Sequence, residues 1–345
     1  MSRIGVAVIG CGAVGQRRAR TAAADPRTEL RVVVDTDRRR SAGLASELGA
    51  DSVRDWRDAL ARQDVGAVVV CTPNALLVPI SIAALRTRRH VLIEKPMGRN
   101  ATEARAVAAE ARKAGTVLKI GFNSRYRPGA VRAHELYASG FIGRLLQLRA
   151  TYGDGGGLNL EREWRADAEL AGGGELLRHG VDIVDLFHWF AGPANRAQSE
   201  LQNAFWNLGR LEDNAFGLLR FGAGVVGQFH VSMTEWQAFF SLELLGESGG
   251  LVLESSSPDV ETLTVIRRGE AGHASTSEKM LIENAESSWT AEWTDFAAAM
   301  HGEPLRHGLP EDGLQIIATI DALYAAARSG SAVSIATLGA DLHAR

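Results

Sequence analysis

The chain has 345 residues, of which 46% are hydrophobic and 23% are charged, so it can form two hydrophobic cores of an ordinary globular kind. Its formal net charge of −3 provides no cationic excess, and we expect neither nucleic acid nor a membrane as a partner. The two cysteines form no C-x-x-C motif, no apolar run has the length of a membrane span, and the first strand begins too early for a signal peptide. These features predict a cytoplasmic protein.

The first predicted strand ends in a glycine-rich turn of the form G-x-G-x-x-G. The turn consists of Gly10, Cys11, Gly12, Ala13, Val14 and Gly15. The first glycine allows the tight turn, the second lets a pyrophosphate approach the backbone, and the third lets the following helix pack closely on the strand. Because the N-terminus of that helix carries free N–H groups and partial positive charge, the pattern predicts a dinucleotide site.

A second apolar run ends at Asp35, 20 positions after Gly15. A carboxylate at this distance can accept both hydroxyls of the adenosine ribose and repels a 2′-phosphate, which favours NAD. Arg38, Arg39 and Arg40 follow, and an arginine nearby can instead accept that phosphate, so NADP remains the alternative cofactor. Arg38 is therefore a candidate cofactor contact.

Strand and helix patterns alternate over the first third of the chain. Strands are expected at 65–71, 90–93 and 117–122, and helices at 38–48, 56–62, 79–86 and 101–114. This alternation predicts a doubly wound parallel sheet in a first domain, residues 1–122. Thr72, Pro73 and Asn74 end the continuous apolar run 65–71, at the strand end where ligands bind in such sheets.

The pattern changes after residue 122. Strands are expected at 145–152, 214–221, 225–233, 239–245, 251–253 and 262–267, and helices at 175–190, 290–300 and 311–328. These elements predict a second α/β domain, residues 123–345, whose large open sheet is mostly antiparallel and covered by helices on one face. The nine histidines form no zinc-binding motif, and we expect no metal.

The chain resembles the glucose-fructose oxidoreductase, inositol dehydrogenase and rhizopine-catabolism family, Gfo/Idh/MocA, over almost its whole length. The matching motifs are the glycine turn, Cys71-Thr72-Pro73-Asn74, Glu94-Lys95-Pro96, Gly121-Phe122-Asn123-x-Arg125-Tyr126-x-Pro128, Trp164-Arg165, Gly172-Gly173-Gly174, Gly180, Asp185 and Glu311-Asp312-Gly313. The resemblance implies a Rossmann first domain and a nicotinamide-dependent oxidoreductase of a sugar, inositol or related polyol. It also implies a homodimer or homotetramer formed through the second-domain sheet.

Oxidation of a secondary alcohol requires removal of a hydride, which the nicotinamide accepts, and of a proton. Lys95 suits the second task, because a lysine partly desolvated at the end of a parallel strand can exchange protons near neutral pH. The resemblance assigns Glu94 to the cofactor ribose and Thr72, Pro73 and Asn74 to the cofactor groove. The candidate substrate contacts are Lys95, Asn123, Arg125, Tyr126, Trp164, Arg165, Arg178 and Asp182.

The chain departs from the family pattern G-G-G-x-L-x-D-x-G-x-H-x-x-D, because Arg178 replaces the aspartate and Asp182 replaces the histidine. Helical spacing predicts that Arg178, Asp182 and Asp185 share one face, with His179 hydrogen-bonded to Asp182. We therefore expect Asp182 and His179 to complete the proton relay with Lys95. Arg178 would bind an anionic or oxygen-rich part of the substrate.

Two alternatives remain open at this stage. In one, tightly held NAD serves for transient oxidation during elimination or glycoside cleavage. In the other, the protein binds NAD as a sensor without catalysis, although mere binding does not need Lys95.

Overall fold

The computed structural model describes residues 3–257, 259–269, 273–283 and 287–335, which form two compact units. Unit 1 contains the described residues through Asn123 together with Trp289–Leu314, and unit 2 contains Ser124–Ser288 and residues 315–335. Sequence order alone assigned Trp289–Leu314 to the second domain. Its contacts group it with unit 1 because Trp293 and Phe296, 1% and 0% exposed, pack into the core of the parallel sheet.

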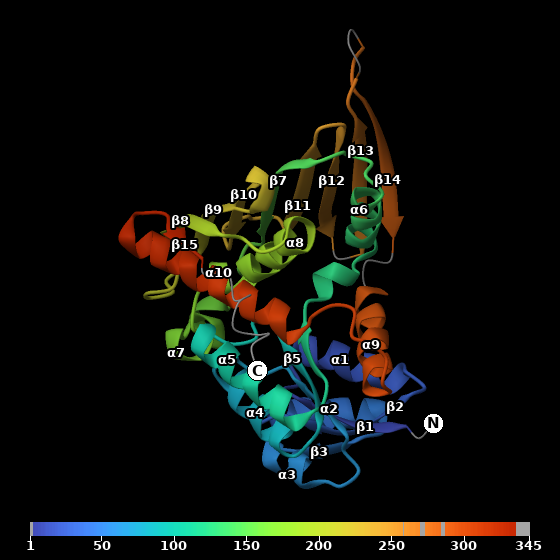
Figure 1. Cartoon of the computed structure of the whole chain (residues 1–345). Helices are drawn as coiled ribbons and strands as arrows, with labels where there is room; N and C mark the ends of the chain where they lie inside the picture. Colours follow the sequence, from blue (N-terminus) through green and yellow to red (C-terminus); the bar gives the residue numbers. More distant parts are fainter. Residues whose placement is uncertain (1–2, 258, 270–272, 284–286, 336–345) are drawn as a thin grey trace. The chain divides into compact units, whose positions relative to one another are not determined.

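Unit 1 is built on a six-stranded parallel sheet in the order β3-β2-β1-β4-β5-β6 (Figure 1). Its strands are β1 (Ile4–Ile9), β2 (Thr28–Val34), β3 (Asp51–Val53), β4 (Ala67–Val70), β5 (His90–Glu94) and β6 (Leu118–Gly121). Every residue of β4 is fully buried, as its uninterrupted apolar sequence predicts for a central strand. The strand order reverses between β1 and β4, and ligands of doubly wound sheets bind at such a switch point.

Three of the helices of unit 1 begin after a residue whose side chain caps the first turn. The helices of this unit are α1 (Ala13–Ala24), α2 (Arg38–Leu48), α3 (Trp56–Ala61), α4 (Asn74–Arg86), α5 (Ala101–Ala114) and α9 (Ser287–Met300). The side chains of Asp37, Asp55 and Asn100 accept backbone N–H groups in the first turns of α2, α3 and α5. The predicted start of α4 at residue 79 was wrong: the helix begins at Asn74, and Pro79 lies within it, because buried Leu77 and Val78 already belong to its packed face.

Unit 2 is built on a nine-stranded sheet in the order β14-β13-β12-β11-β7-β10-β9-β8-β15. Its strands are β7 (Leu145–Gly153), β8 (Arg196–Gln202), β9 (Asn214–Arg220), β10 (Val226–Ser232), β11 (Phe239–Gly246), β12 (Gly249–Ser257), β13 (Val260–Arg267), β14 (Thr276–Glu283) and β15 (Val333–Ser334). Neighbours pair antiparallel except β7 and β10, which confirms the predicted mixed α/β class. Strands β8, β14 and β15 were not predicted, because strands near a sheet edge are short or carry mostly polar, exposed residues.

Helices cover one face of this sheet (Figure 1). They are α6 (Pro128–Ala138), α8 (Val181–Ala191) and α10 (Pro310–Ser329), whereas the short α7 (Ala168–Ala171) belongs to a separate small cluster with Leu208 and Leu211. Helix α6 packs on β12 and β13, and α8 packs on β7. The predicted helix 175–190 is not uniform: a π-helical turn, Leu176–Gly180, precedes α8.

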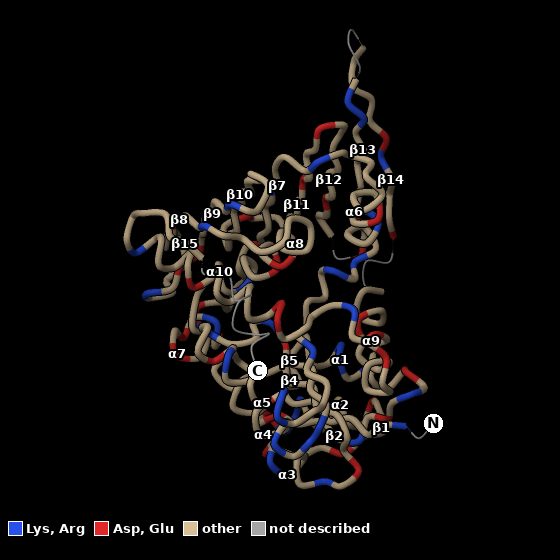
Figure 2. The backbone as a smooth tube through the Cα atoms, viewed as in Figure 1, with Lys and Arg blue, Asp and Glu red and all other residues tan. Residues whose placement is uncertain are grey.

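Acidic and basic residues are interspersed along both units (Figure 2), in agreement with the small net charge. None of the helices in the described part of the chain is long and apolar enough to span a membrane.

Candidate functional site

The glycine turn of unit 1 has the geometry that its sequence predicts. Gly10 has φ +96°, and a Cβ on Gly15 would lie 1.8 Å from the Gly10 carbonyl oxygen, so these two glycines are required by the protein itself. Gly12 is different, because its backbone is extended and a Cβ there would meet nothing within 4 Å. Neither packing nor backbone conformation explains Gly12, whereas a phosphate close to the N-terminus of α1 does.

Asp35 stands at the end of β2 with a fixed carboxylate. Oδ2 accepts the Cys11 N–H at 2.8 Å and Oδ1 accepts the Asp37 N–H at 2.8 Å. Each oxygen keeps a lone pair that can accept a ribose hydroxyl. Arg38 is exposed and has no ion pair with any described residue, whereas Arg40 lies 3.4 Å from Asp37.

The end of β4 supplies a second group suited to a ligand. The Thr72 hydroxyl is buried and has no hydrogen-bond partner among the described residues, which is unusual for a buried polar group. Cys11 and Cys71 flank this region, but burial raises the pKa of the Cys11 thiol to about 12 and raises that of Cys71 well above its usual value. Both thiols are therefore protonated near neutral pH, and neither is an activated nucleophile. Together with Gly12 and Asp35, Thr72 makes this strand edge fit NAD.

Glu94, the last residue of β5, belongs to a buried ionic cluster. Its Oε1 accepts Arg18 Nε at 2.7 Å, and the same guanidinium bonds Glu292 Oε2 on α9 at 2.5 Å. Burial raises the pKa of Glu94, and Arg18 opposes this shift. Arg18 bonds Oε1, and no described residue donates a hydrogen bond to Oε2. Because the Glu94 side chain keeps 12% of its surface exposed, Oε2 can accept a hydroxyl.

Lys95 follows β5 directly and is half-buried. The segment after it is held firmly, since a Cβ on Gly313 would lie 2.3 Å from the sulfur of buried Met97. Gly313, the glycine of the Glu311-Asp312-Gly313 motif, therefore packs within unit 1 against Met97, the residue that follows Glu94-Lys95-Pro96. Lys95 thus extends from a closely packed strand end, as a positioned proton-transfer group requires.

In unit 2, the three glycines before the π turn are explained by local packing. Gly172 has φ +80°, a Cβ on Gly173 would lie 2.3 Å from the Tyr324 hydroxyl, and a Cβ on Gly174 would lie 2.0 Å from the Glu212 carbonyl oxygen. These contacts within unit 2 account for all three glycines.

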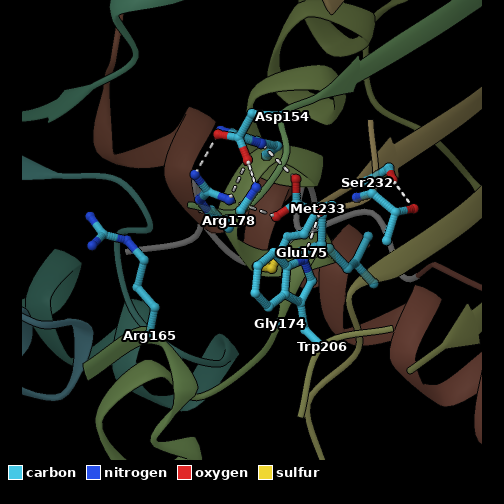
Figure 3. A network of polar contacts seen from close by, with 12 residues as sticks. Asp154, Arg165, Gly174, Glu175, Arg178, Trp206, Ser232 and Met233 are labelled. Atoms are coloured by element: carbon cyan, nitrogen blue, oxygen red, sulfur yellow. Dashed lines mark hydrogen bonds and ion pairs between the residues drawn. The ribbon is translucent and has the colours of Figure 1, made fainter. Parts of the chain in front are cut away.

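Arg178 lies between two carboxylates (Figure 3). Its NH2 is 2.7 Å from Asp154 Oδ2, and its NH1 is 3.4 Å from Glu175 Oε2. Its two neighbours hold the pKa of Arg178 above its ordinary value despite burial, and Arg178 lowers the pKa of Asp154 against the effect of burial. Arg178 is therefore engaged by the protein itself.

The predicted hydrogen bond between His179 and Asp182 was wrong. His179 Nδ1 instead lies 2.6 Å from Glu175 Oε1, and Glu175 is fully buried. The reason is local backbone geometry: Glu175 and His179 are four residues apart, and the π-helical turn between them brings their side chains together. The predicted common face of Arg178, Asp182 and Asp185 also fails at Asp185, which turns inward to Arg125 at 2.6 Å and is fully buried.

The remaining candidate substrate residues lie in varied surroundings. Arg125 and Tyr126 are buried, and Arg125 is held by Asp185, whereas Asn123 is partly exposed at the start of a 3₁₀ turn. Trp164 packs beside a small core cluster, with the Arg165 guanidinium 4.7 Å from its ring centroid. Arg165 pairs with Glu163 at 2.8 Å and lies apart from the Asp154–Arg178 pair (Figure 3).

Sequence reasoning missed Glu175, Asp154 and Tyr152, which surround His179 and Arg178. The spacing of Glu175 and His179, four residues apart, is a visible signal for the first. No local signal marks Asp154 or Tyr152, which reach the site from β7 and its end. Among the described residues, no group of three or more His, Cys, Asp or Glu side chains is arranged to hold a metal ion.

Two family models match the chain. Residues 4–122 match the oxidoreductase family with an NAD-binding Rossmann fold, and residues 130–252 match the GFO/IDH/MocA C-terminal domain. Together they cover the glycine turn, Lys95 and the π turn, and they agree with the resemblance inferred from the motifs.

Individual relatives point the same way. The 1,5-anhydro-D-fructose reductase of Ensifer adhaerens is 30% identical over 90% of this chain and 92% of its own length. The inositol 2-dehydrogenase of Rubrobacter xylanophilus is 25% identical over 97% of this chain and 94% of its own. The crystal structure of GenD2 from gentamicin A biosynthesis, in complex with NAD, has a TM-score of 0.84 at 29% identity and covers 97% of both chains.

Proposed function

This chain belongs to the Gfo/Idh/MocA family of NAD-binding oxidoreductases, and we propose that it transfers a hydride between NAD and a sugar, a cyclitol or a related keto-sugar. The relatives that suggest this substrate class are named for anhydrofructose and inositol. Bound NAD supplies the hydride acceptor, and the chain supplies orientation and proton transfer. The observation that carries the proposal is Lys95, which directly follows the buried end of β5, beside the predicted cofactor strands.

The proposed cofactor contacts are those at the carboxyl ends of β1, β2 and β4. Gly12 and the N-terminus of α1 would receive the pyrophosphate, and Asp35 would accept the ribose hydroxyls. Thr72 would use its unpartnered hydroxyl, and Glu94 its remaining oxygen, toward the nicotinamide half.

Lys95 would hold the reacting oxygen and exchange its proton, with Asp182 and His179 completing the relay. Trp164 would stack on an apolar sugar face. We also propose a cytoplasmic location, in keeping with the two free cysteines, and a homo-oligomer formed through the sheet of unit 2.

The test is a panel of cyclitols, aldoses and ketoses with NAD or NADH, followed at the nicotinamide absorbance with purified protein. Turnover that needs added NAD, and that is lost in Lys95→Ala, is the expected result. Turnover without added NAD would instead favour a tightly held redox catalyst. Tight NAD binding without turnover on any member would favour a sensor.

A further inference from the structure

We propose that Glu175 and His179 form a proton-transfer dyad, in which Glu175 orients the imidazole and His179 Nε2 accepts the proton that leaves the substrate hydroxyl. This inference rests on the proposed function, because it names the groups that handle the proton of that reaction. In oxidation, the O–H bond breaks and its proton is relayed by way of Lys95 to Nε2, while the C–H hydride goes to NAD. In reduction, the carbonyl carbon receives the hydride and the oxygen receives the proton.

The contact between the two side chains defines which nitrogen is available. His179 Nδ1 lies 2.6 Å from Glu175 Oε1, and the other oxygen of Glu175 faces Arg178 NH1 at 3.4 Å. A carboxylate beside a guanidinium is an acceptor, so Nδ1 must carry the proton and donate it. The neutral ring then has its lone pair on Nε2, to which no described residue donates a hydrogen bond.

The ring is also held in one plane. Tyr152 of β7 stacks on it with centroids 4.1 Å apart and planes 22° apart, and Phe240 of β11 packs edge-on against Tyr152 at 5.5 Å. Burial raises the pKa of Tyr152 far above its usual value, so the phenol stays neutral. The imidazole side chain keeps 11% of its surface exposed, in contrast to fully buried Glu175. One edge of an otherwise enclosed ring is therefore accessible.

The backbone that carries the dyad is anchored from outside its own helix. Glu212 Oε1 accepts the N–H groups of Gly174 and Leu176, each at 3.1 Å, and the Tyr324 hydroxyl at 2.7 Å. Its carbonyl oxygen accepts the Glu175 N–H at 3.0 Å. These four bonds fix the start of the π turn, on which His179 lies and which Glu175 directly precedes. Turns of this kind occur often at functional sites.

The charged groups around the ring come from three elements. Glu175, Arg178 and Asp182 lie on its own helix, Tyr152 and Asp154 come from β7 and the residue after it, and His230 comes from β10. Arg178 and Asp154 pair with each other at 2.7 Å, which leaves Glu175 as the carboxylate in direct contact with the imidazole.

A spectroscopic measurement tests the dyad without any substrate. ¹⁵N-histidine NMR of the full chain at pH 8 is expected to show His179, assigned by loss of its signal in His179→Gln, as the Nδ1–H tautomer. Glu175→Gln should weaken that tautomeric preference. An Nε2–H tautomer in the unmodified protein would overturn the proposal, because Nε2 could not then accept a proton.

Kinetics provide the second measurement, on the substrate found with the panel. His179→Gln should lower kcat by roughly 10²–10⁴, with a smaller change in KM and with loss of one limb of the pH profile. Glu175→Gln should lower kcat by roughly tenfold or more while NADH affinity is unchanged. His134→Gln is the matched control, since His134 also stacks on an aromatic ring, 4.1 Å from Trp189, and its activity should stay within twofold.

Two results separate this inference from the proposed function. Unchanged turnover and pH profile in His179→Gln, with activity lost in Lys95→Ala, would overturn the dyad alone. Absence of turnover in the unmodified protein would overturn the proposed function, and the tautomer would still decide whether the dyad is formed. If Glu175→Gln does not fold, His179→Gln and the tautomer give the answer.

Discussion

Units 1 and 2 each hold an arginine between two carboxylates, but the two clusters differ in their access to solvent. In unit 1, Arg18 lies between Glu94 at 2.6 Å and Glu292 at 2.5 Å, and its side chain is 1% exposed. In unit 2, Arg178 lies between Asp154 at 2.7 Å and Glu175 at 3.4 Å, and its side chain is 24% exposed. The Arg18 cluster is thus buried, whereas the Arg178 cluster, built from similar residue types, is accessible to solvent.

The difference separates structural from chemical roles. The Arg18 guanidinium also packs over Trp289, 4.6 Å from the ring centroid, so the cluster ties α1, β5 and α9 together. The Arg178 cluster instead leaves an imidazole edge accessible. We infer that a buried ion pair is informative about function only when one member retains an accessible atom with free hydrogen-bonding capacity.

The largest expected effect is at Lys95, beside the buried cluster but outside it. Lys95→Ala should lower turnover by roughly 10²–10⁴, because a positioned acid–base group is lost, while NAD affinity stays nearly unchanged. Steady-state rates and fluorescence titration with NADH measure the two quantities. Lys113→Ala, in the exposed last turn of α5, is the control. Turnover within a few-fold of the parent would show that the proton is handled elsewhere.

The two arginines provide the next comparison. Arg18→Met leaves two buried carboxylates without their cation and should reduce the free energy of unfolding by about 3–5 kcal/mol. Arg178→Met should cost clearly less, about 1 kcal/mol, because water reaches that cluster. Urea unfolding at pH 7 measures both. Equal losses would mean that exposure does not distinguish the clusters.

A third kind of buried group, a neutral histidine, should make unit 2 sensitive to acid. Burial, aided by Arg125, lowers the pKa of His188 to about 3, and both Ala194 N–H and the Thr319 hydroxyl approach its Nε2, at 3.4 and 3.3 Å. In the unfolded chain, His188 binds a proton below the ordinary histidine pKa of about 6.5, whereas in the folded protein it binds a proton only near pH 3. The stability that this histidine contributes is therefore complete above pH 6.5 and is lost progressively as the pH falls toward 3.

The expected loss from this histidine between pH 7 and pH 5 is at most about 2 kcal/mol, and His188→Leu should remove that part of the pH dependence. Urea unfolding at both pH values gives the difference. His273→Leu, at an exposed position, is the control and should leave the slope with pH as it is in the parent. If the free energy of unfolding depends on pH equally in the parent and in His188→Leu, His188 is not held as a neutral, buried imidazole.

The smallest expected effect concerns cofactor choice in unit 1. Asp35→Ala should narrow the preference for NADH over NADPH by roughly tenfold, because the carboxylate no longer accepts the ribose hydroxyls or repels a 2′-phosphate. Asp35→Asn keeps an acceptor for the Cys11 N–H but removes the negative charge. This variant therefore distinguishes the effect of the charge on cofactor choice from the effect of the hydrogen bond on the turn. Tighter binding of NADPH by the parent would show that Arg38 governs the choice.

The sequence by itself determined the parallel sheet, the glycine turn, Asp35 and the position of Lys95. Each depends on residues near one another in the chain, because strand and helix periods and turn chemistry are local. The continuous apolar run of β4 predicted a central strand, and its residues are fully buried. The polar edge strand β14 was missed because its exposed side chains leave no such signal.

The tertiary structure alone decided the partners of the charged residues. Arg18 meets Glu292 across 274 positions, and Arg178 meets Asp154 across 24, distances over which no periodic pattern extends. Glu212, 36 positions after Leu176, fixes the π turn, and that turn directs His179 to Glu175 instead of Asp182. Long-range contacts form when packed elements bring side chains together, so the chemistry of this helix could be read only from the fold.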